Sequence, residues 1–115
     1  MQAIDKELLR GYIDPIILSL LARDDSYGYD LTKQAHDQTE GFFELKEGTL
    51  YVALKRLEKA GYVTSYWQEG SGAARRKYYH LTVSGKAELT KKQAEWQLIK
   101  KMMDKFYGGN YDTNN

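Results

Sequence analysis

The sequence predicts an α+β fold that is mainly helical. Apolar residues recur with a helical period in three short segments and in one long C-terminal segment. Two runs rich in aromatic and β-branched residues, joined by a Gly-rich loop, are typical of a β-hairpin. The length of 115 residues and the 42% hydrophobic content suit one compact domain. A two-stranded sheet is too small to be stable alone, so we expect it to pack on the helices.

The first helix is expected between Leu8 and Arg23, where apolar residues recur every three to four positions. Pro15 lies inside this pattern, and its nitrogen cannot donate a hydrogen bond to the carbonyl of Gly11. Two alternatives follow. Either Asp14 caps a helix whose first residue is Pro15, or one longer helix kinks at that position.

The second helix is expected over the sequence YGYDLTKQAHDQ. Ser26 precedes it and is a residue type that caps helix N-termini, while Leu31 and Ala35 fall on its expected buried side. The following TEGFFEL is expected to be a connector that turns at Gly41 and packs its two phenylalanines.

The third helix, expected from about Lys46 to Ala60 and stopped by Gly61, has two chemically different sides. At about 100° per residue, its three leucines, with two alanines beside them, fall on the side expected to be buried. The opposite side carries small, β-branched and basic residues, with two larger side chains toward its edges: Gly48, Val52, Lys55 and Lys59, then Tyr51 and Arg56. Such a face suits a DNA major groove, where valine meets a thymine methyl and cations reach phosphates or guanine edges. Because most basic helix faces are simply solvated, this helix alone leaves both interpretations open.

Basic charge is concentrated on this helix and on the hairpin that follows it. The net charge is only +1, but residues 1–45 hold four Lys/Arg against nine Asp/Glu, whereas residues 46–82 hold seven against three. The hairpin is expected over YVTSYW and RRKYYHLT, with QEGSGAA as its loop. Its second strand opens with Arg75, Arg76 and Lys77. This triplet can reach a neighbouring minor groove or phosphates, and it can equally protect the sheet edge from pairing with other strands.

The last helix is expected to begin at Ser84. Five apolar residues recur in it on two interleaved seven-residue spacings: Leu89, Trp96, Ile99, Met103 and Phe106. This is the a/d pattern of a helix that pairs with another helix, and Lys92 interrupts it. Three short helices cannot cover this seam, so a second copy of the chain is its natural cover. Residues 108–115 are expected to form a flexible tail.

The stretch GTLYVALKRLEKAGYVTSYW, followed by GAARRKYYHLTVSGK, resembles the PadR family of winged-helix transcriptional regulators. YGYDL in the second helix and a Trp near the middle of the long last helix resemble the same family, so the resemblance covers about residues 8–106. It implies a winged helix-turn-helix domain over 1–82, with a two-stranded wing, and a dimerisation helix over 83–107. A single C-terminal helix is similar to the compact branch of the family, which includes drug-responsive repressors. The resemblance therefore implies a ligand-responsive homodimer that binds a near-palindromic operator in double-stranded DNA.

The resemblance also implies site residues. It assigns DNA contacts to Thr49, Tyr51 and Lys55 in the recognition helix and to Arg75, Arg76 and Lys77 in the wing, while the helical wheel adds Val52 and Lys59. In the compact branch the matching Trp lines a pore at the dimer interface. Trp96, with Ile99 and Met103 as walls, is therefore a candidate site for a flat aromatic inducer. The alternative is that Trp96 only packs in the interface.

Other function classes find less support in the sequence. No nucleophile, base and orienting group form a recognisable set, so no enzymatic activity is expected. His36 and His80 lie on different expected elements and the chain has no cysteine, so neither a metal site nor another cofactor is expected. The lack of cysteine fits a reducing cytoplasm, and the apolar run IILSLLA is too short to span a bilayer, so we expect a cytoplasmic protein without a membrane partner. A winged helix that binds only proteins is the main alternative, and such a module would tolerate loss of the basic residues.

Overall fold

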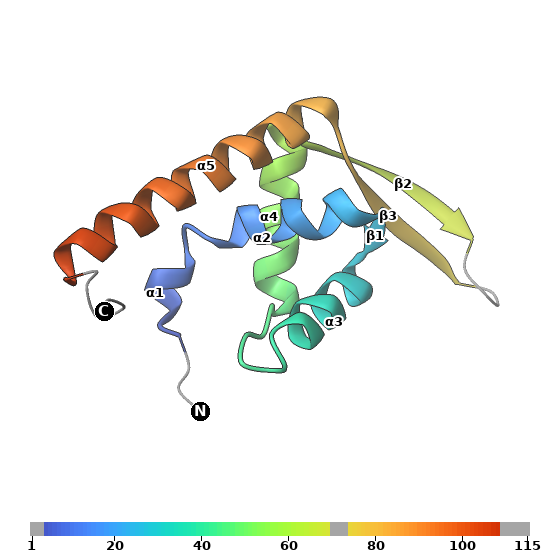
Figure 1. Cartoon of the computed structure of the whole chain (residues 1–115). Helices are drawn as coiled ribbons and strands as arrows, with labels where there is room; N and C mark the ends of the chain where they lie inside the picture. The colour runs from blue at the N-terminus through green and yellow to red at the C-terminus, as the bar shows by residue number, and fades with distance from the viewer. Residues whose placement is uncertain (1–3, 70–73, 109–115) are drawn as a thin grey trace.

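The computed structural model describes residues 4–69 and 74–108. Within these residues, five helices and three strands follow one another: α1 (Lys6–Leu9), α2 (Ile13–Arg23), β1 (Ser26–Tyr27), α3 (Gly28–Gln38), α4 (Glu47–Lys59), β2 (Val63–Glu69), β3 (Arg75–Leu81) and α5 (Val83–Phe106). Figure 1 shows the hairpin β2–β3 projecting to one side of α2, α3 and α4, and α5 extending to the other side. The predicted α+β winged-helix fold is confirmed. The expected tail beyond Gly108 and most of the hairpin loop lie outside the described residues.

The helical conformation is interrupted before Pro15 and not at Pro15 itself. α1 ends at Leu9 and α2 begins at Ile13, so Pro15 lies in the first turn of α2. An N–H group in a first turn has no acceptor within the helix, so proline loses nothing there. Both predicted alternatives are therefore wrong. Asp14 lies inside the helix instead of capping it, and its carboxylate pairs with Arg56 of α4.

A short strand that the sequence did not predict, β1, joins the hairpin. The antiparallel sheet has the order β1-β3-β2, and Ser26 of β1 pairs with Tyr79 of β3. Ser26 is buried, and its hydroxyl donates a hydrogen bond to Oδ2 of Asp30 at 2.7 Å. The prediction that Ser26 caps the second helix is therefore wrong, because Tyr27 occupies the N-cap position.

One hydrophobic core joins the helices to the inner face of the sheet. The most deeply buried side chains come from α2, α3, α4, the loop before α4 and β2: Ile17, Leu18, Leu31, Leu45, Leu50, Leu54 and Val63. The predicted buried side of the third helix is confirmed for its leucines and for Ala53, whereas Ala60 at the C-cap is exposed. The two phenylalanines of the connector differ, since Phe43 is 6% exposed and Phe42 is 49% exposed.

The end of α4 and the start of α5 meet in a crowded corner. Gly61 has φ of +83°, so a residue in the left-handed region ends α4 as predicted. The side chain of Thr82 caps α5, because its Oγ1 accepts a hydrogen bond from the backbone nitrogen of Gly85 at 3.0 Å. Gly85 is buried, and a Cβ atom added there would overlap the backbone carbonyl oxygen of Tyr62. A side chain at this position is therefore expected to push α5 away from the corner.

We expect Gly85→Ala to lower the free energy of unfolding by about 1–3 kcal/mol, the usual effect of overpacking a core. Urea unfolding followed by circular dichroism measures this change. Gly48→Ala is the control, because an added Cβ at Gly48 meets no atom within 4 Å. In an exposed helix, alanine is expected to stabilise by about 0.5–1 kcal/mol relative to glycine. Equal stability of Gly85→Ala and the parent would contradict the tight packing of this corner.

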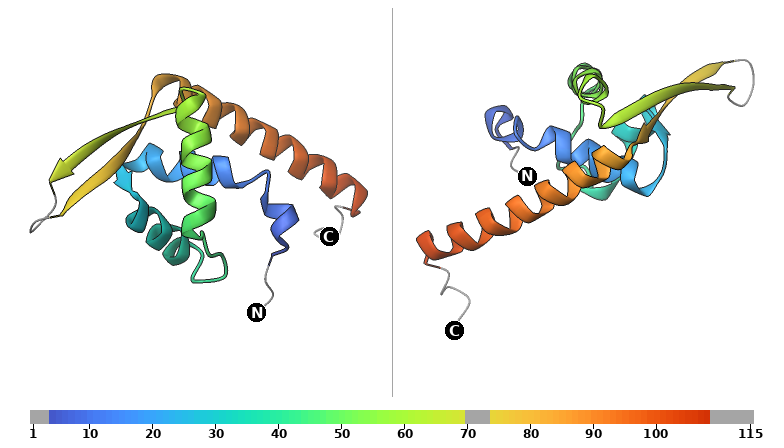
Figure 2. Two further views of the ribbon diagram at one scale, coloured as in Figure 1. Left: turned by 180° about the vertical axis from the view of Figure 1, so that it is seen from behind. Right: turned by 90° about the horizontal axis from the view of Figure 1, so that it is seen from above.

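The fold is elongated because the hairpin and α5 extend in opposite directions, as Figure 2 shows from above. α5 packs against α2 only over its first part. Leu89 there is 8% exposed, whereas Leu98 and Phe106 farther along are 67% and 78% exposed. Across residues 4–69 and 74–108, the structure contains no helix with the length and apolar character needed to cross a membrane.

Candidate DNA-binding surface

The outer side of α4 carries all five predicted recognition-helix residues, and each of them is exposed: Thr49, Tyr51, Val52, Lys55 and Lys59. The buried leucines hold the opposite side of the helix against α2 and α3. Within the described residues, neither Lys55 nor Lys59 has an ion-pair or hydrogen-bond partner. Their ammonium groups are therefore free to bind phosphates or base edges.

Arg56, at the edge of the same face, differs from these lysines. Its Nε donates a hydrogen bond to Oδ2 of Asp14 at 3.2 Å, and a second nitrogen contacts the other carboxylate oxygen. This hydrogen bonding raises the pKa of Arg56 above its ordinary value. Arg56 therefore attaches α4 to α2 and has less freedom to reach a ligand than the sequence indicated.

Tyr51 is positioned by the first residue of α3. An added Cβ at Gly28 would overlap the Tyr51 hydroxyl, so only glycine lets the phenol lie against the start of that helix. Gly28 is buried, and Tyr51 keeps 47% of its surface exposed. The glycine of YGYDL thus has a physical role that the sequence analysis did not identify: it sets the direction of a predicted DNA-contact residue.

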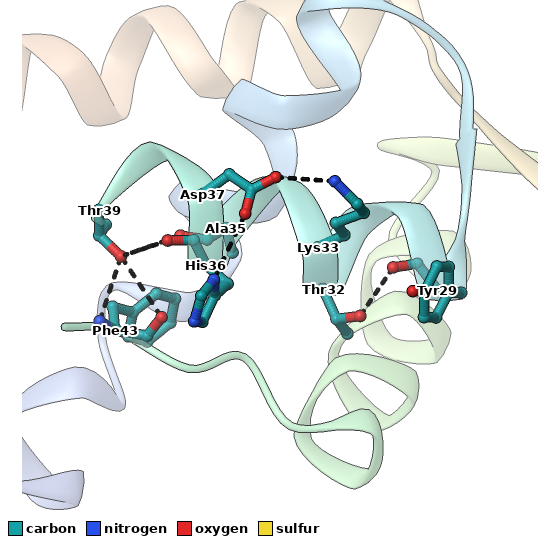
Figure 3. A network of polar contacts seen from close by, with 8 residues as sticks. All are labelled: Tyr29, Thr32, Lys33, Ala35, His36, Asp37, Thr39 and Phe43. Carbon is teal, nitrogen blue, oxygen red and sulfur yellow. Dashed lines mark hydrogen bonds and ion pairs between the residues drawn. The ribbon is translucent and has the colours of Figure 1, made fainter. Parts of the chain in front are cut away.

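The connection between α3 and α4 is tightened by Thr39. Its hydroxyl donates to the carbonyl of Ala35 at 3.0 Å and accepts from the nitrogen of Phe43 at 3.1 Å (Figure 3). Gly41 follows with φ of +87°, as its predicted turn role requires. These contacts fix the direction in which the chain leaves α3 and enters α4.

The structure separates the three predicted wing cations onto two faces of the hairpin. Directly paired residues in antiparallel strands share a face, and neighbours along a strand point to opposite faces. Lys77 pairs with Trp67, and Arg75 pairs with Glu69, on the face that also carries the buried pair Val63 and Leu81. Ser65 on this face donates to the carboxylate of Glu58 in α4 at 2.7 Å. Arg75 and Lys77 therefore share the face of the sheet that adjoins α4.

Arg76 lies on the opposite face. Its guanidinium is 4.5 Å from the ring centroid of Tyr27 in β1. The pleat of the strand thus places Arg76 on the opposite face from Arg75 and Lys77. That all three contact DNA stays a prediction.

Trp67 on β2 was missed as a candidate. Its side chain is 57% exposed and lies between the two cations of the α4-facing side, with Arg75 at 5.0 Å and Lys77 at 5.9 Å from its ring centroid. Trp67 thus forms one exposed surface with these two cations, on the side of the hairpin that adjoins α4. The period of two along the predicted strand would have placed Trp67 on the same face as Val63.

A second candidate site lies between α2 and α5. The indole of Trp96 meets the ring of Tyr12 edge-on at a centroid distance of 6.0 Å. A groove of about 520 Å³ is lined mainly by Tyr12, Pro15, Ile16, Leu89, Trp96 and Ile99. Of the three predicted ligand residues, Trp96 and Ile99 thus line the groove, and Met103 lies one helical turn beyond Ile99.

The predicted dimer residues divide into one covered and four uncovered side chains. Leu89 lies in the core of its own chain and offers little surface to a partner. Trp96 is 47%, Ile99 40% and Phe106 78% exposed, and Met103 is partly exposed. Lys92 lies between two carboxylates, at 3.9 Å from Glu88 and 3.4 Å from Glu95. That this ionic cluster interrupts a contact between two copies of α5 stays a prediction.

Comparison with known proteins identifies the family. Residues 17–91 match the transcriptional regulator PadR-like family. The chain belongs to this family. A solved transcriptional regulator from Clostridium thermocellum is similar to it, with a TM-score of 0.83 and 45% identity over 90% of this chain and 98% of that chain. An uncharacterized protein of Lysinibacillus sphaericus is 37% identical over 106 residues, which are 92% of this chain and 97% of that protein.

The PadR family also includes a relative solved with DNA. PadR of Bacillus subtilis, in complex with operator DNA, is similar to this chain with a TM-score of 0.65 and 30% identity, over 71% of this chain and 47% of that chain. The same relative is named a negative transcriptional regulator, and the match covers 40% of its length. These findings confirm the predicted family and the winged-helix fold.

Proposed function

We propose that this PadR-family protein is a transcriptional repressor that binds double-stranded DNA as a homodimer. α4 enters the major groove, and the hairpin β2–β3 is the wing that contacts the backbone beside it. The observation that carries the proposal is the unpaired state of Lys55 and Lys59, within the described residues, on the outer side of α4, next to a sheet face that presents Arg75 and Lys77. Such a cluster of exposed cations, in which Arg75 also lies 4.0 Å from a carboxylate oxygen of Glu69, attracts phosphates and releases their counterions. The operator complex of Bacillus subtilis PadR supports this assignment.

The proposal assigns residues 1–82 to DNA binding and α5 to dimerisation, as in the compact branch of the family. The exposed apolar side chains of α5 supply a surface that a second α5 would cover. Two recognition helices related by a two-fold axis bind half-sites about one helical turn, roughly 10 bp, apart or a multiple of it. The operator is therefore expected to be near-palindromic.

A titration of the full chain with the upstream DNA of its own gene tests the proposal. Fluorescence anisotropy at several salt concentrations is expected to give binding about 10³-fold or more tighter than to unrelated DNA of equal length, with affinity that falls as salt rises. Equal affinity for both DNAs would contradict a sequence-specific regulator. A module that binds only proteins would show the same weak binding to both and no effect of replacing Lys55.

We further propose that the groove beside Trp96 takes a flat, apolar or cationic aromatic molecule. The indole is 47% exposed, and the groove that it lines, about 520 Å³, is of the size that binds small ligands. The face of an indole attracts a cationic ring, whereas Glu95 in the lining is already paired with Lys92 at 3.4 Å. For such a ligand to act as an inducer, it must bind more tightly to the protein conformation that does not fit the operator.

Quenching of Trp96 by ethidium or a Hoechst-type dye is the expected signature. Trp67→Phe serves as the background, so that Trp96 is the remaining indole. In that background the dye is expected to quench the fluorescence of the protein without DNA, and to weaken operator binding more than it does in the Trp96→Ala variant, since these dyes also bind duplex DNA directly. A further Trp96→Ala substitution is expected to weaken dye binding about 5-fold or more, which corresponds to the stacking and cation–π energy of about 1 kcal/mol. Unchanged dye affinity in the alanine variant would show that Trp96 does not bind the dye, and would leave it only a packing role in the interface.

A further inference from the structure

We infer that Asp25 is a positioning residue for DNA binding, which holds the wing at the angle where its cations and those of α4 contact one duplex. The inference rests on the proposed function. Asp25 lies in the segment between α2 and β1 and belongs to neither predicted contact set. It acts through the hairpin and does not itself touch DNA.

One carboxylate joins both strands of the wing. Oδ2 of Asp25 accepts a hydrogen bond from the hydroxyl of Tyr66 in β2 at 2.7 Å. Oδ1 lies 2.8 Å from Nδ1 of His80 in β3. Because a carboxylate only accepts, Nδ1 carries the hydrogen of this contact. Asp25 therefore connects the helical body to both strands, at positions that lie two residue pairs apart along the hairpin, since Tyr66 pairs with Tyr78 and His80 pairs with Thr64.

Asp25 contacts one face of the hairpin, and α4 contacts the opposite face. Tyr66 and His80 alternate with Ser65 and Tyr79, so their side chains point to the other face of the sheet. From the α4 side, Ser65 bonds to Glu58 at 2.7 Å. The base of the hairpin is thus held from both faces, and loss of either hydrogen bond lets it rotate toward the other side.

Beyond Tyr66, the wing contacts the rest of the chain through Arg76, whose guanidinium lies 4.5 Å from the ring of Tyr27. Gln68 and Glu69 are exposed, and β1 pairs only with Tyr78 and Tyr79 of β3. The hairpin continues well beyond the core in Figure 2. From His80 to Arg75 the strand spans roughly 17 Å at about 3.3 Å per residue, so a rotation of about 10° at the base moves the cation by roughly 3 Å. A shift of this size is enough to break a charge-assisted hydrogen bond.

At neutral pH Asp25 is ionised and the hydroxyl of Tyr66 is protonated, which the hydrogen bond between them requires. Burial alone would raise the pKa of Asp25, but the hydrogen bonds from Tyr66 and His80 outweigh it and lower the pKa below its ordinary value. The same contact raises the pKa of Tyr66 to about 12, so the phenol keeps its proton as donor. The Asp25 side chain is 34% exposed and contributes little to the core. Its removal is therefore expected to change the direction of the wing more than the stability of the fold.

Asp25→Ala and Asp24→Ala form a matched pair for the test. Asp24 is the neighbouring, exposed carboxylate, so its removal reproduces the charge change without altering the hairpin contact. We expect Asp25→Ala to weaken operator binding about 10-fold relative to Asp24→Ala. We also expect the dependence of log K on log salt to become shallower by about 1–2, because each phosphate that is no longer neutralised removes about 0.9 from the slope. Tyr66→Phe, which removes one hydroxyl and is expected to stay folded, is expected to weaken binding about 3-fold.

A double-mutant cycle separates positioning from general destabilisation. In a background with Arg75→Ala and Lys77→Ala, the wing no longer supplies these cations, so Asp25→Ala and Tyr66→Phe are expected to cause no further loss of affinity. A full, additive loss in that background would overturn the inference. So would an Asp25→Ala variant that binds operator as tightly as Asp24→Ala. A parent protein that does not prefer its operator would instead overturn the proposed function itself.

Discussion

Replacing Ile99 and Met103 by glutamate is expected to give a monomer that binds operator about 100-fold more weakly or worse, because a dimer gains 10²–10⁴ from two linked contacts. Both positions lie on the apolar side of α5, near Trp96, and Ile99 is 40% exposed. Four glutamates near a two-fold axis would repel each other, and removing their charges from water would cost free energy. Sedimentation velocity at micromolar protein measures the first effect, and anisotropy with operator DNA measures the second.

A control with the same change in net charge is available on the other side of α5. Gln97→Glu with Lys101→Gln also makes the protein two units more negative, and both residues are exposed. This control is expected to remain a dimer and to lose only the part of the affinity that depends on overall charge. A well-folded parent that sediments as a monomer at micromolar concentration would contradict dimerisation through α5. A glutamate variant that stays dimeric would do the same.

Replacing Lys55 by alanine is expected to cost about 1–3 kcal/mol of operator affinity if its ammonium reads a base, and to relax specificity at one position. If Lys55 contacts phosphate, the loss is instead equal for all DNA sequences. Its freedom from ion pairs within the described residues, in contrast to Arg56, is the reason for the large expected effect. Titrations of operator and of single-base variants of the operator distinguish the two cases.

Removing the wing cations with Arg75→Ala and Lys77→Ala is expected to weaken binding to every DNA sequence. The salt slope is expected to fall by about 0.9 for each phosphate that the variant no longer binds. Lys105→Ala is the control, because Lys105 is an exposed lysine in the last turn of α5, far along the chain from the wing. If the Lys55 variant and the wing variant both bound the operator like the parent, α4 and the hairpin would not form the DNA-binding surface.

The elements with a strong local pattern could be predicted from the sequence. The predicted bounds of α4 agree with the structure within one residue at each end, because its leucines repeat with a helical period and Gly61 adopts the left-handed conformation that ends it. The hairpin and α5 also follow from local patterns. β1 has only two residues, so it shows no period, and pairing with β3 alone defines it. For that reason the local pattern at Ser26 indicated a helix cap and not a strand.

The candidate site shows the same division. The fold class, the outward face of α4 and the three wing cations follow from the sequence alone, because they depend on spacing along one helix or one strand. Which of the charged side chains are free depends on the tertiary structure. Arg56 pairs with Asp14, and His80 pairs with Asp25, across 42 and 55 positions of the chain. A local sequence pattern cannot predict pairs so far apart in the chain, because these pairs depend on how separate elements pack around the core.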